Sequence, residues 1–236
     1  MKKKDKTTNK SLNSIYKFMA DTYHGNWQYR WGKTPWMQKH IKIGRNESIS
    51  GHQWACIGFW FHLSRVCPSL EALVDTKEIY ERLWSHDLGE TFEGDVPQFD
   101  QLSGRGVNKH ITERKEIEKM GKQIPRKILK QMLDWFTEFE EDFENMDNLE
   151  VLVAKFIDTV QGNHYAVVFG NNLSEHSQAI DKIVGRSLIP IATRLLEILR
   201  QRGHKKAHQE VMNVTTHLLK FFKKAGVKIN FNIYSK

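Results

Sequence analysis

The feature of this sequence that most constrains its fold is a hydrophobic pattern of helical period along nearly the whole chain. Apolar residues recur three and four positions apart, for example at Leu188, Ala192, Leu195 and Leu199. This spacing places them on one face of an α-helix. No stretch alternates apolar and polar residues over more than a few positions, as a half-buried strand would. The sequence therefore predicts an all-α protein.

Capping and breaking residues divide the chain into expected helices. Pro125 and Pro190 lie where helices can begin, Ser50 is an expected N-cap, and Gly226 follows two lysines as a stop signal. Residues 99–109 read as a polar loop that contains glycine. The expected helices span residues 11–22, 49–67, 76–86, 113–123, 125–143, 149–168, 176–202 with room for a break at Pro190, and 204–224.

Length and composition limit the class of protein. With 236 residues, 39% of them hydrophobic and 27% charged, we expect one large domain with a well-formed core. There is neither a secretory signal nor an apolar run of the roughly 20 residues that cross a bilayer, so we expect a soluble, cytoplasmic protein. Cys56 and Cys67 are then reduced core residues. Four tryptophans are expected to pack in the interior: Trp27, Trp31, Trp54 and Trp60.

The net charge of +8 raises the question of nucleic-acid binding. Much of the excess lies in the first ten residues and around Arg200–Lys206, where it is expected to be solvated. A positive field also attracts a small phosphorylated substrate. Nucleic acid is therefore an alternative partner rather than the expected one.

One short segment carries residues suited to metal chemistry. In Trp84–Glu90 a histidine and an aspartate are adjacent, His86 and Asp87, and Glu90 follows three residues later. Residues three and four apart share a helix face. The first two side chains can bind a metal, and Glu90 can act on a proton of the attacking water.

Two other helical segments supply further ligands. His52 lies at the start of an apolar segment, and Asp158 interrupts another. An ionised carboxylate in an apolar helix needs a compensating cation or donor. The four expected ligands are His52, His86, Asp87 and Asp158, a set that suits one divalent transition metal ion such as Mn, Co, Zn, Ni or Fe.

The order of these residues resembles the HD-domain metal-dependent phosphohydrolases. The 5'-deoxynucleotidase branch is most similar, through three motifs: Arg45-Asn-Glu-Ser-Ile-Ser-Gly-His52, His86-Asp-Leu-Gly-Glu90 and Gly94-Asp-Val-Pro97. The resemblance covers about residues 36 to 160. It implies a helical HD-domain bundle with additional N- and C-terminal helices. We expect a disordered basic arm at 1–10 and a single domain at 11–236, with its core at about 36–170 and a C-terminal extension at 171–236.

The resemblance also implies roles for individual residues. Glu90 and Asp95 are the implied catalytic residues. Arg45 is the implied phosphate ligand, because a guanidinium binds phosphate through two hydrogen bonds. Trp36 and Lys39 are implied to contact the rest of the substrate. The histidines at 110, 164, 176, 204, 208 and 217 lack supporting spacing.

We therefore expect a metal-dependent phosphohydrolase that releases phosphate from deoxyribonucleoside monophosphates. Its partner is a nucleotide substrate, and a homodimer or higher homo-oligomer is expected. One alternative is an HD-type deoxynucleoside triphosphate hydrolase, which uses the same ligands with a wider basic mouth. The other is a non-catalytic HD protein that binds nucleic acid through its basic ends.

Overall fold

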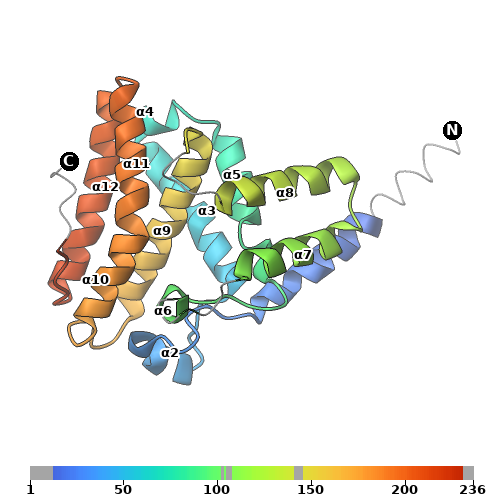
Figure 1. Cartoon of the computed structure of the whole chain (residues 1–236), viewed down its shortest axis with the longest axis horizontal. Helices are drawn as coiled ribbons and strands as arrows, with labels where there is room; N and C mark the ends of the chain where they lie inside the picture. Colours follow the sequence, from blue (N-terminus) through green and yellow to red (C-terminus); the bar gives the residue numbers. More distant parts are fainter. Residues whose placement is uncertain (1–12, 102–103, 105–107, 141–145, 231–236) are drawn as a thin grey trace, which may run out of the picture.

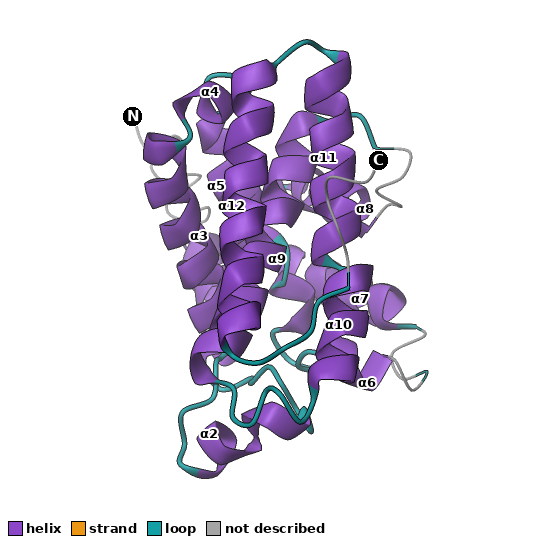
Figure 2. Cartoon of the chain, turned by 90° about the vertical axis from the view of Figure 1, so that its left-hand side faces the viewer, coloured by secondary structure: helices purple, strands orange, loops and turns teal. Residues whose placement is uncertain are grey.

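The computed structural model of the chain describes residues 13–101, 104, 108–140 and 146–230 (Figure 1). Every regular element in this part is a helix (Figure 2), and the only strand-type pairing among these residues is an isolated antiparallel bridge between Tyr29 and Ser48. The expected all-α class is confirmed. None of the helices described is long and apolar enough to cross a membrane.

The longest helix, α9 (Leu149–Phe169), lies at the centre of the bundle (Figure 1). It is apolar on most sides, which is the pattern of a helix surrounded by others. Its neighbours on one side are α3 (Ile49–Val66), α5 (Thr76–Ser85) and α8 (Arg126–Glu140). On the other side it packs against α11 (Leu188–Gln201) and α12 (Lys205–Lys224).

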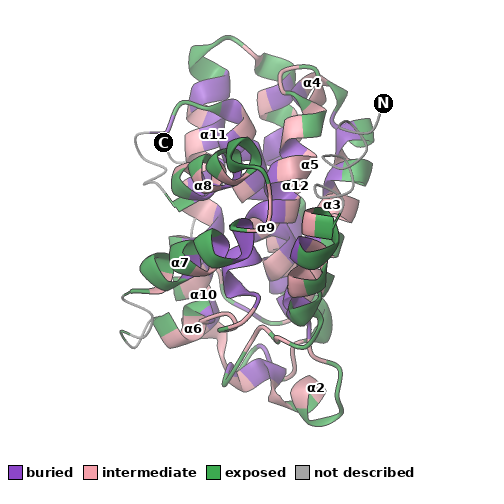
Figure 3. Ribbon diagram, turned by 90° about the vertical axis from the view of Figure 1, so that its right-hand side faces the viewer, coloured by how far each residue is buried: buried purple, intermediate pink, exposed green. Residues whose placement is uncertain are grey.

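The C-terminal helices α10 (Ser177–Arg186), α11 and α12 belong to the same apolar cluster as α3, α5 and α9. Figure 3 shows how the buried residues concentrate around α9. The break expected at Pro190 lies three residues earlier, at Ser187, because proline is tolerated in the first turn of a helix. The division into a core and a C-terminal extension stays a prediction.

A second, smaller apolar cluster holds the other end of the molecule together. Phe18, from the helix at residues 13–22, packs with Leu88, Ile117, Met132 and Phe136. These residues come from the 3₁₀ helix η3 (Leu88–Glu90), from α7 (Lys109–Gly121) and from α8. The expected arm at 1–10 lies outside the described residues.

Short elements complete the chain and correct two local expectations. They are η1 (Tyr23–Asn26), η2 (Pro35–Met37), α2 (Gln38–Lys42), α4 (Pro68–Glu71) and α6 (Gln98–Gln101). The expected loop at 99–109 thus contains part of a helix, and Lys109 already begins α7. Helix α3 is capped by Ser48 rather than Ser50, since the Ser48 hydroxyl accepts a hydrogen bond from the Gly51 N–H at 3.0 Å.

The tryptophans divide between interior and surface. Trp60 is fully buried, and Trp31 stacks on Tyr165 with ring centroids 5.8 Å apart, as expected of packing residues. Trp27 and Trp54 are exposed, so the expectation that they pack inside is wrong. The helical pattern around Trp54 is apolar on all sides and does not distinguish the inner face from the outer one.

Candidate metal centre and adjoining pocket

The four expected metal ligands come from three places that meet in the bundle. His52 lies in the first turns of α3, His86 and Asp87 follow the end of α5, and Asp158 lies in the middle of α9. Because α3 and α5 both pack against α9, these side chains are brought together from positions more than 100 residues apart.

The ligand atoms converge on one point. The Nε2 atoms of His52 and His86 are 3.2 Å apart, and His52 Nε2 is 2.9 Å from Asp158 Oδ1. Asp87 Oδ2 lies 3.3 Å from His86 Nε2 and 3.5 Å from His52 Nε2. Ligand atoms bound about 2.0–2.2 Å from one ion would be separated by roughly such distances.

Hydrogen bonds fix the orientation of both imidazoles. The Nδ1–H of His86 donates to the Leu83 carbonyl at 2.9 Å, and the Nδ1–H of His52 donates to Gln161 Oε1 at 2.5 Å. Gln161 is oriented in turn, because its Nε2 donates to Glu47 Oε1 at 2.7 Å. Both Nε2 atoms are thus left to face the centre, as in histidines that bind metals.

The charges at this point call for a cation. Asp87 Oδ2 is buried and has no hydrogen-bond partner among the described residues. Burial lowers the pKa of His86, but Asp87 and Asp158 outweigh it and raise that pKa to about 9. Hydrogen bonds from His52 and His86 keep the pKa of Asp158 well below its usual value, although burial acts in the opposite direction. The donor set therefore fits a divalent metal ion, which would replace the proton of His86.

Cys56 also lies next to the centre, with its Sγ 3.6 Å from Nε2 and 3.7 Å from Nδ1 of His52. The sulfur is almost equally far from both ring nitrogens, so it does not lie in line with the lone pair of Nε2, where a metal would bind. Burial raises the pKa of the thiol, so it stays protonated. For this reason we propose Asp87 as the fourth ligand, and Cys56 as a packing residue.

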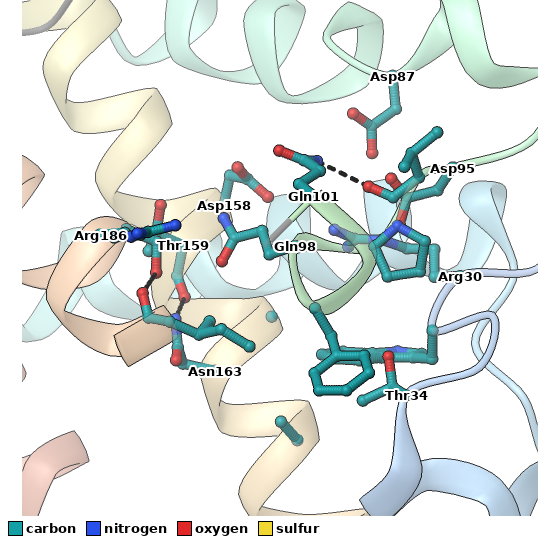
Figure 4. A pocket seen from close by; sticks show the side chains of 18 of the residues that line it. Arg30, Thr34, Asp87, Asp95, Gln98, Gln101, Asp158, Thr159, Asn163 and Arg186 are labelled. Carbon is teal, nitrogen blue, oxygen red and sulfur yellow. Dashed lines mark hydrogen bonds and ion pairs between the residues drawn. The ribbon is translucent and has the colours of Figure 1, made fainter. Parts of the chain in front are cut away.

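A pocket of about 350 Å³ opens beside the metal ligands (Figure 4). Asp87 and Asp158 lie in its wall, together with Glu90 and Asp95, the two expected catalytic carboxylates. Trp36 also lines the pocket, and its indole packs edge-to-face against Phe99 with centroids 5.5 Å apart. The structure thus brings the expected ligands, Glu90, Asp95 and Trp36 to one place.

Lys109 connects the carboxylates of the pocket. Its Nζ lies 2.6 Å from Glu90 Oε1, 3.3 Å from Asp95 Oδ1 and 3.3 Å from Glu113 Oε1. Burial, together with Asp87 and Asp95, raises the pKa of Glu90 well above its usual value, although Lys109 opposes this. Sequence reasoning missed Lys109. The available signal was its spacing of four residues from Glu113.

Arg45 and Lys39 are not brought to the pocket. Both are exposed and neither lines it. Gly44 has a left-handed φ of 72°, and the Arg45 N–H donates back to the His40 carbonyl at 2.9 Å. This turn directs Arg45 away from the site, so the implied position of the phosphate ligand is corrected.

Arg30 occupies the place expected for Arg45. Its guanidinium lies 3.8 Å from Glu47 Oε2 and 3.8 Å from Asp95 Oδ2. Its Nε and Nη1 atoms are buried without a hydrogen-bond partner in the described structure. Burial lowers the pKa of Arg30, but Glu47 and Asp95 raise it above its usual value, so it stays charged. Nothing in its sequence context, Trp27-Gln-Tyr-Arg30-Trp31, had indicated this position.

Comparisons with known proteins agree with this arrangement. Residues 34–199 match the HD domain family. The fold is similar to the crystal structure of a predicted metal-dependent phosphohydrolase from Magnetospirillum magnetotacticum MS-1, with a TM-score of 0.57 and 16% sequence identity over 90% of this chain and 97% of that one. No curated protein matches the sequence. The family match spans well over half of the chain, and the chain therefore belongs to the HD-domain family.

Proposed function

We propose that this protein is a metal-dependent phosphohydrolase that removes phosphate from a nucleotide, in the first place a deoxyribonucleoside 5'-monophosphate. The observation that carries the proposal is the convergence of four ligands beside a pocket whose wall contains three of them, His86, Asp87 and Asp158. The same pocket also holds Arg30, Glu90 and Asp95. HD-family membership and the similarity to a predicted metal-dependent phosphohydrolase support the reaction class.

His52, His86, Asp87 and Asp158 would hold the metal. When bound, a divalent ion supplies positive charge that polarises a phosphoryl oxygen and activates water. The imidazole orientations set by Leu83 and Gln161 keep both Nε2 atoms available for it. The protein's own contribution is therefore a rigid ligand set held by three packed helices.

Arg30 binds the phosphate in this proposal. Its planar guanidinium lines the pocket and suits two phosphate oxygens. Asp95 and Glu47 neutralise and orient the side chain from behind. As negative charge grows on the phosphate oxygens during the reaction, a preoriented cation at this position stabilises it.

Glu90 handles the proton. Its raised pKa lets it keep a proton at a higher pH than an ordinary carboxyl, which suits a group that donates to the leaving oxygen. Lys109, 2.6 Å away, holds the carboxyl in place and lowers the cost of ionising it afterwards. Asp95 forms ion pairs with both Arg30 and Lys109. It therefore connects the phosphate-binding side of the pocket to Glu90, the proton donor.

A nucleoside can occupy the rest of the pocket. Its volume lies within the range of small-molecule sites, and Trp36 and Phe99 give it an aromatic wall. The indole N–H of Trp36 is itself buried and has no partner in the described structure, so the contribution of Trp36 to the pocket is its ring. The second candidate function is triphosphate hydrolysis, which the extension of the pocket towards α10 favours.

The proposal is tested by incubating the metal-loaded protein with deoxyribonucleoside mono-, di- and triphosphates and following phosphate, pyrophosphate and triphosphate separately. We expect phosphate from the monophosphates, and none when His52→Ala replaces the wild type. Release of triphosphate alone would favour the second candidate. No release from any nucleotide, with salt-dependent retention of DNA on nitrocellulose, would favour the nucleic-acid-binding alternative.

A further inference from the structure

The pocket continues into a second compartment away from the metal ligands. This compartment has a volume of about 230 Å³ and is lined by Gln98, Gln101, Ile183 and Arg186. All four residues also line the main pocket, so the two spaces are continuous. In Figure 4, Arg186 lies on the opposite side of Gln98 and Gln101 from Arg30 and Asp95.

Among the described residues no hydrogen bond or ion pair holds Arg186, unlike Arg30 and Lys109 in the same pocket. Arg30 is paired with Glu47 and Asp95, and Lys109 with Glu90, Asp95 and Glu113. Among the described residues no carboxylate lines the second compartment. Asp100 lies between Gln98 and Gln101 in sequence, but its carboxylate is close to Gly32. A Cβ added to Gly32 would lie 3.4 Å from Asp100 Oδ2.

Helix α9 forms an open wall of the main pocket. Asp158, Gly162 and Ala166 follow one another at four-residue intervals on α9, and all three line the pocket. At 1.5 Å per residue this wall is about 12 Å long. A Cβ added to Gly162 would meet no atom within 4 Å. The main pocket therefore has free space along α9, and both Asp158 and Arg186 line it. A substrate with two anionic groups can occupy this space.

We propose that Arg186, assisted by the side-chain amides of Gln98 and Gln101, binds a second phosphate group of the substrate, distinct from the one that is removed. The inference rests on the proposed function only for the identity of the first phosphate. A guanidinium and amide N–H groups are the donors that phosphate oxygens prefer. Gln101 Nε2 is oriented here by its 2.7 Å hydrogen bond to the Val96 carbonyl. Such a group can be the 3'-phosphate of a nucleoside 3',5'-bisphosphate or the end of a 5'-triphosphate.

The test compares three substrates: a deoxynucleoside 5'-monophosphate, its 3',5'-bisphosphate and its 5'-triphosphate. For each substrate, kcat/KM is measured from the release of phosphate, pyrophosphate or triphosphate. The Kd is measured by calorimetry with the Glu90→Gln protein, which is expected to turn the substrate over slowly. Arg186→Gln should lower the preference for one of the larger substrates over the monophosphate by about 10-fold, the scale of a charge-assisted hydrogen bond near solvent. Arg186→Lys should restore part of it. The substrate affected identifies the source of the second phosphate.

Lys182→Gln is the matched control, because Lys182 is exposed on the same helix, carries the same charge and does not line the pocket. Equal losses on all three substrates, no loss, or the same loss from the control would overturn the proposal. If the wild type hydrolyses none of the three, the proposed function fails. The Kd values still decide the subsite, which stands only if Arg186→Gln removes a preference for a second phosphate.

Discussion

The Nε2 atoms of His52 and His86 lie 3.2 Å apart, and each ring is held by a hydrogen bond from its Nδ1 atom. Two nitrogens whose lone pairs face each other repel unless a cation lies between them. Asp87 and Asp158 add negative charge at the same point. The arrangement is therefore one that a proton or a metal ion must complete, and the following predictions depend on it.

Removing one ligand should remove the metal. In His52→Ala and Asp158→Ala an incomplete ligand set remains, and the other buried charge is left unpaired. We expect both proteins to lose most bound metal, measured by elemental analysis after dialysis. Cys56→Ala is the control, since the sulfur faces the side of the His52 ring, and it should keep its metal. Full occupancy in both ligand variants would refute the assignment.

Gln161 should affect the metal without touching it. Its Oε1 accepts the Nδ1–H of His52, and residues in such positions typically change metal affinity 10- to 100-fold. Gln161→Leu should weaken metal binding by about that factor in a competition with a chelating dye. Gln131→Leu, an exposed position on α8, is the comparison. Unchanged affinity in Gln161→Leu would mean that the ring of His52 is fixed by packing alone.

Metal affinity should depend on pH through His86. The carboxylates raise the pKa of this histidine from 6.5 to about 9 despite its burial, so below pH 9 the metal-free protein carries a proton that the ion must displace. Affinity should therefore rise about tenfold for each pH unit between 7 and 9 and level off above that range. The measurement is a series of chelator competitions across this range. A flat profile would show that no proton is displaced.

The same shift sets the stability of the metal-free protein. Because the pKa of His86 is higher in the folded state than in the unfolded chain, its contribution is fully present below about pH 6.5. It is lost as the pH rises through 9. Thermal unfolding of metal-free samples should follow this trend, which supplies an independent check on the previous prediction.

The sequence predicted the helical class and four side chains that the structure brings together, because both depend on local signals. Periodicity defines helices, and buried acidic or imidazole side chains in apolar helices need a counterpart. A long apolar helix such as α9 also indicates where a bundle is centred. Packing of α3 and α5 against this helix then brings His52, His86 and Asp158 together.

The phosphate side of the pocket could not be predicted in the same way. Arg30 and Arg45 lie on either side of an irregular segment whose path depends on Gly32 and Gly44, both with positive φ, and on the Tyr29–Ser48 bridge. Such turns place a side chain without leaving a periodic pattern. Lys109 and Arg186 enter from α7 and α10, far along the chain, and only the tertiary structure shows that they face the site. Homo-oligomer formation stays a prediction.

Replacing Glu90 should separate chemistry from metal binding. Its carboxyl is buried and lies outside the ligand set, with Lys109 at 2.6 Å. Glu90→Gln preserves shape but cannot donate the acidic proton, so kcat should fall by about 10² to 10⁴ while metal content stays unchanged. The exposed Glu93→Gln is the control. A nearly normal kcat in Glu90→Gln would show that another group handles the proton.

The two arginines provide the sharpest test of the site. Arg30 lines the pocket and is held by Glu47 and Asp95, whereas Arg45 is exposed behind a turn. Arg30→Lys keeps the charge but loses the planar pair of donors, so kcat/KM for the monophosphate should fall about 10- to 100-fold, the range of charge-assisted hydrogen bonds. Metal content should not change, because Arg30 is not a ligand.

Arg45→Lys and Arg45→Ala should behave like the wild type in the same assay, since neither removes a contact of the pocket. Arg30→Ala should be more impaired than Arg30→Lys, because it also leaves Glu47 without its cation and Asp95 with Lys109 alone. Circular dichroism melts separate this effect from unfolding. If instead the Arg45 variants lose activity while Arg30→Lys retains it, the phosphate ligand is Arg45, and the turn at Gly44 must rearrange when substrate binds.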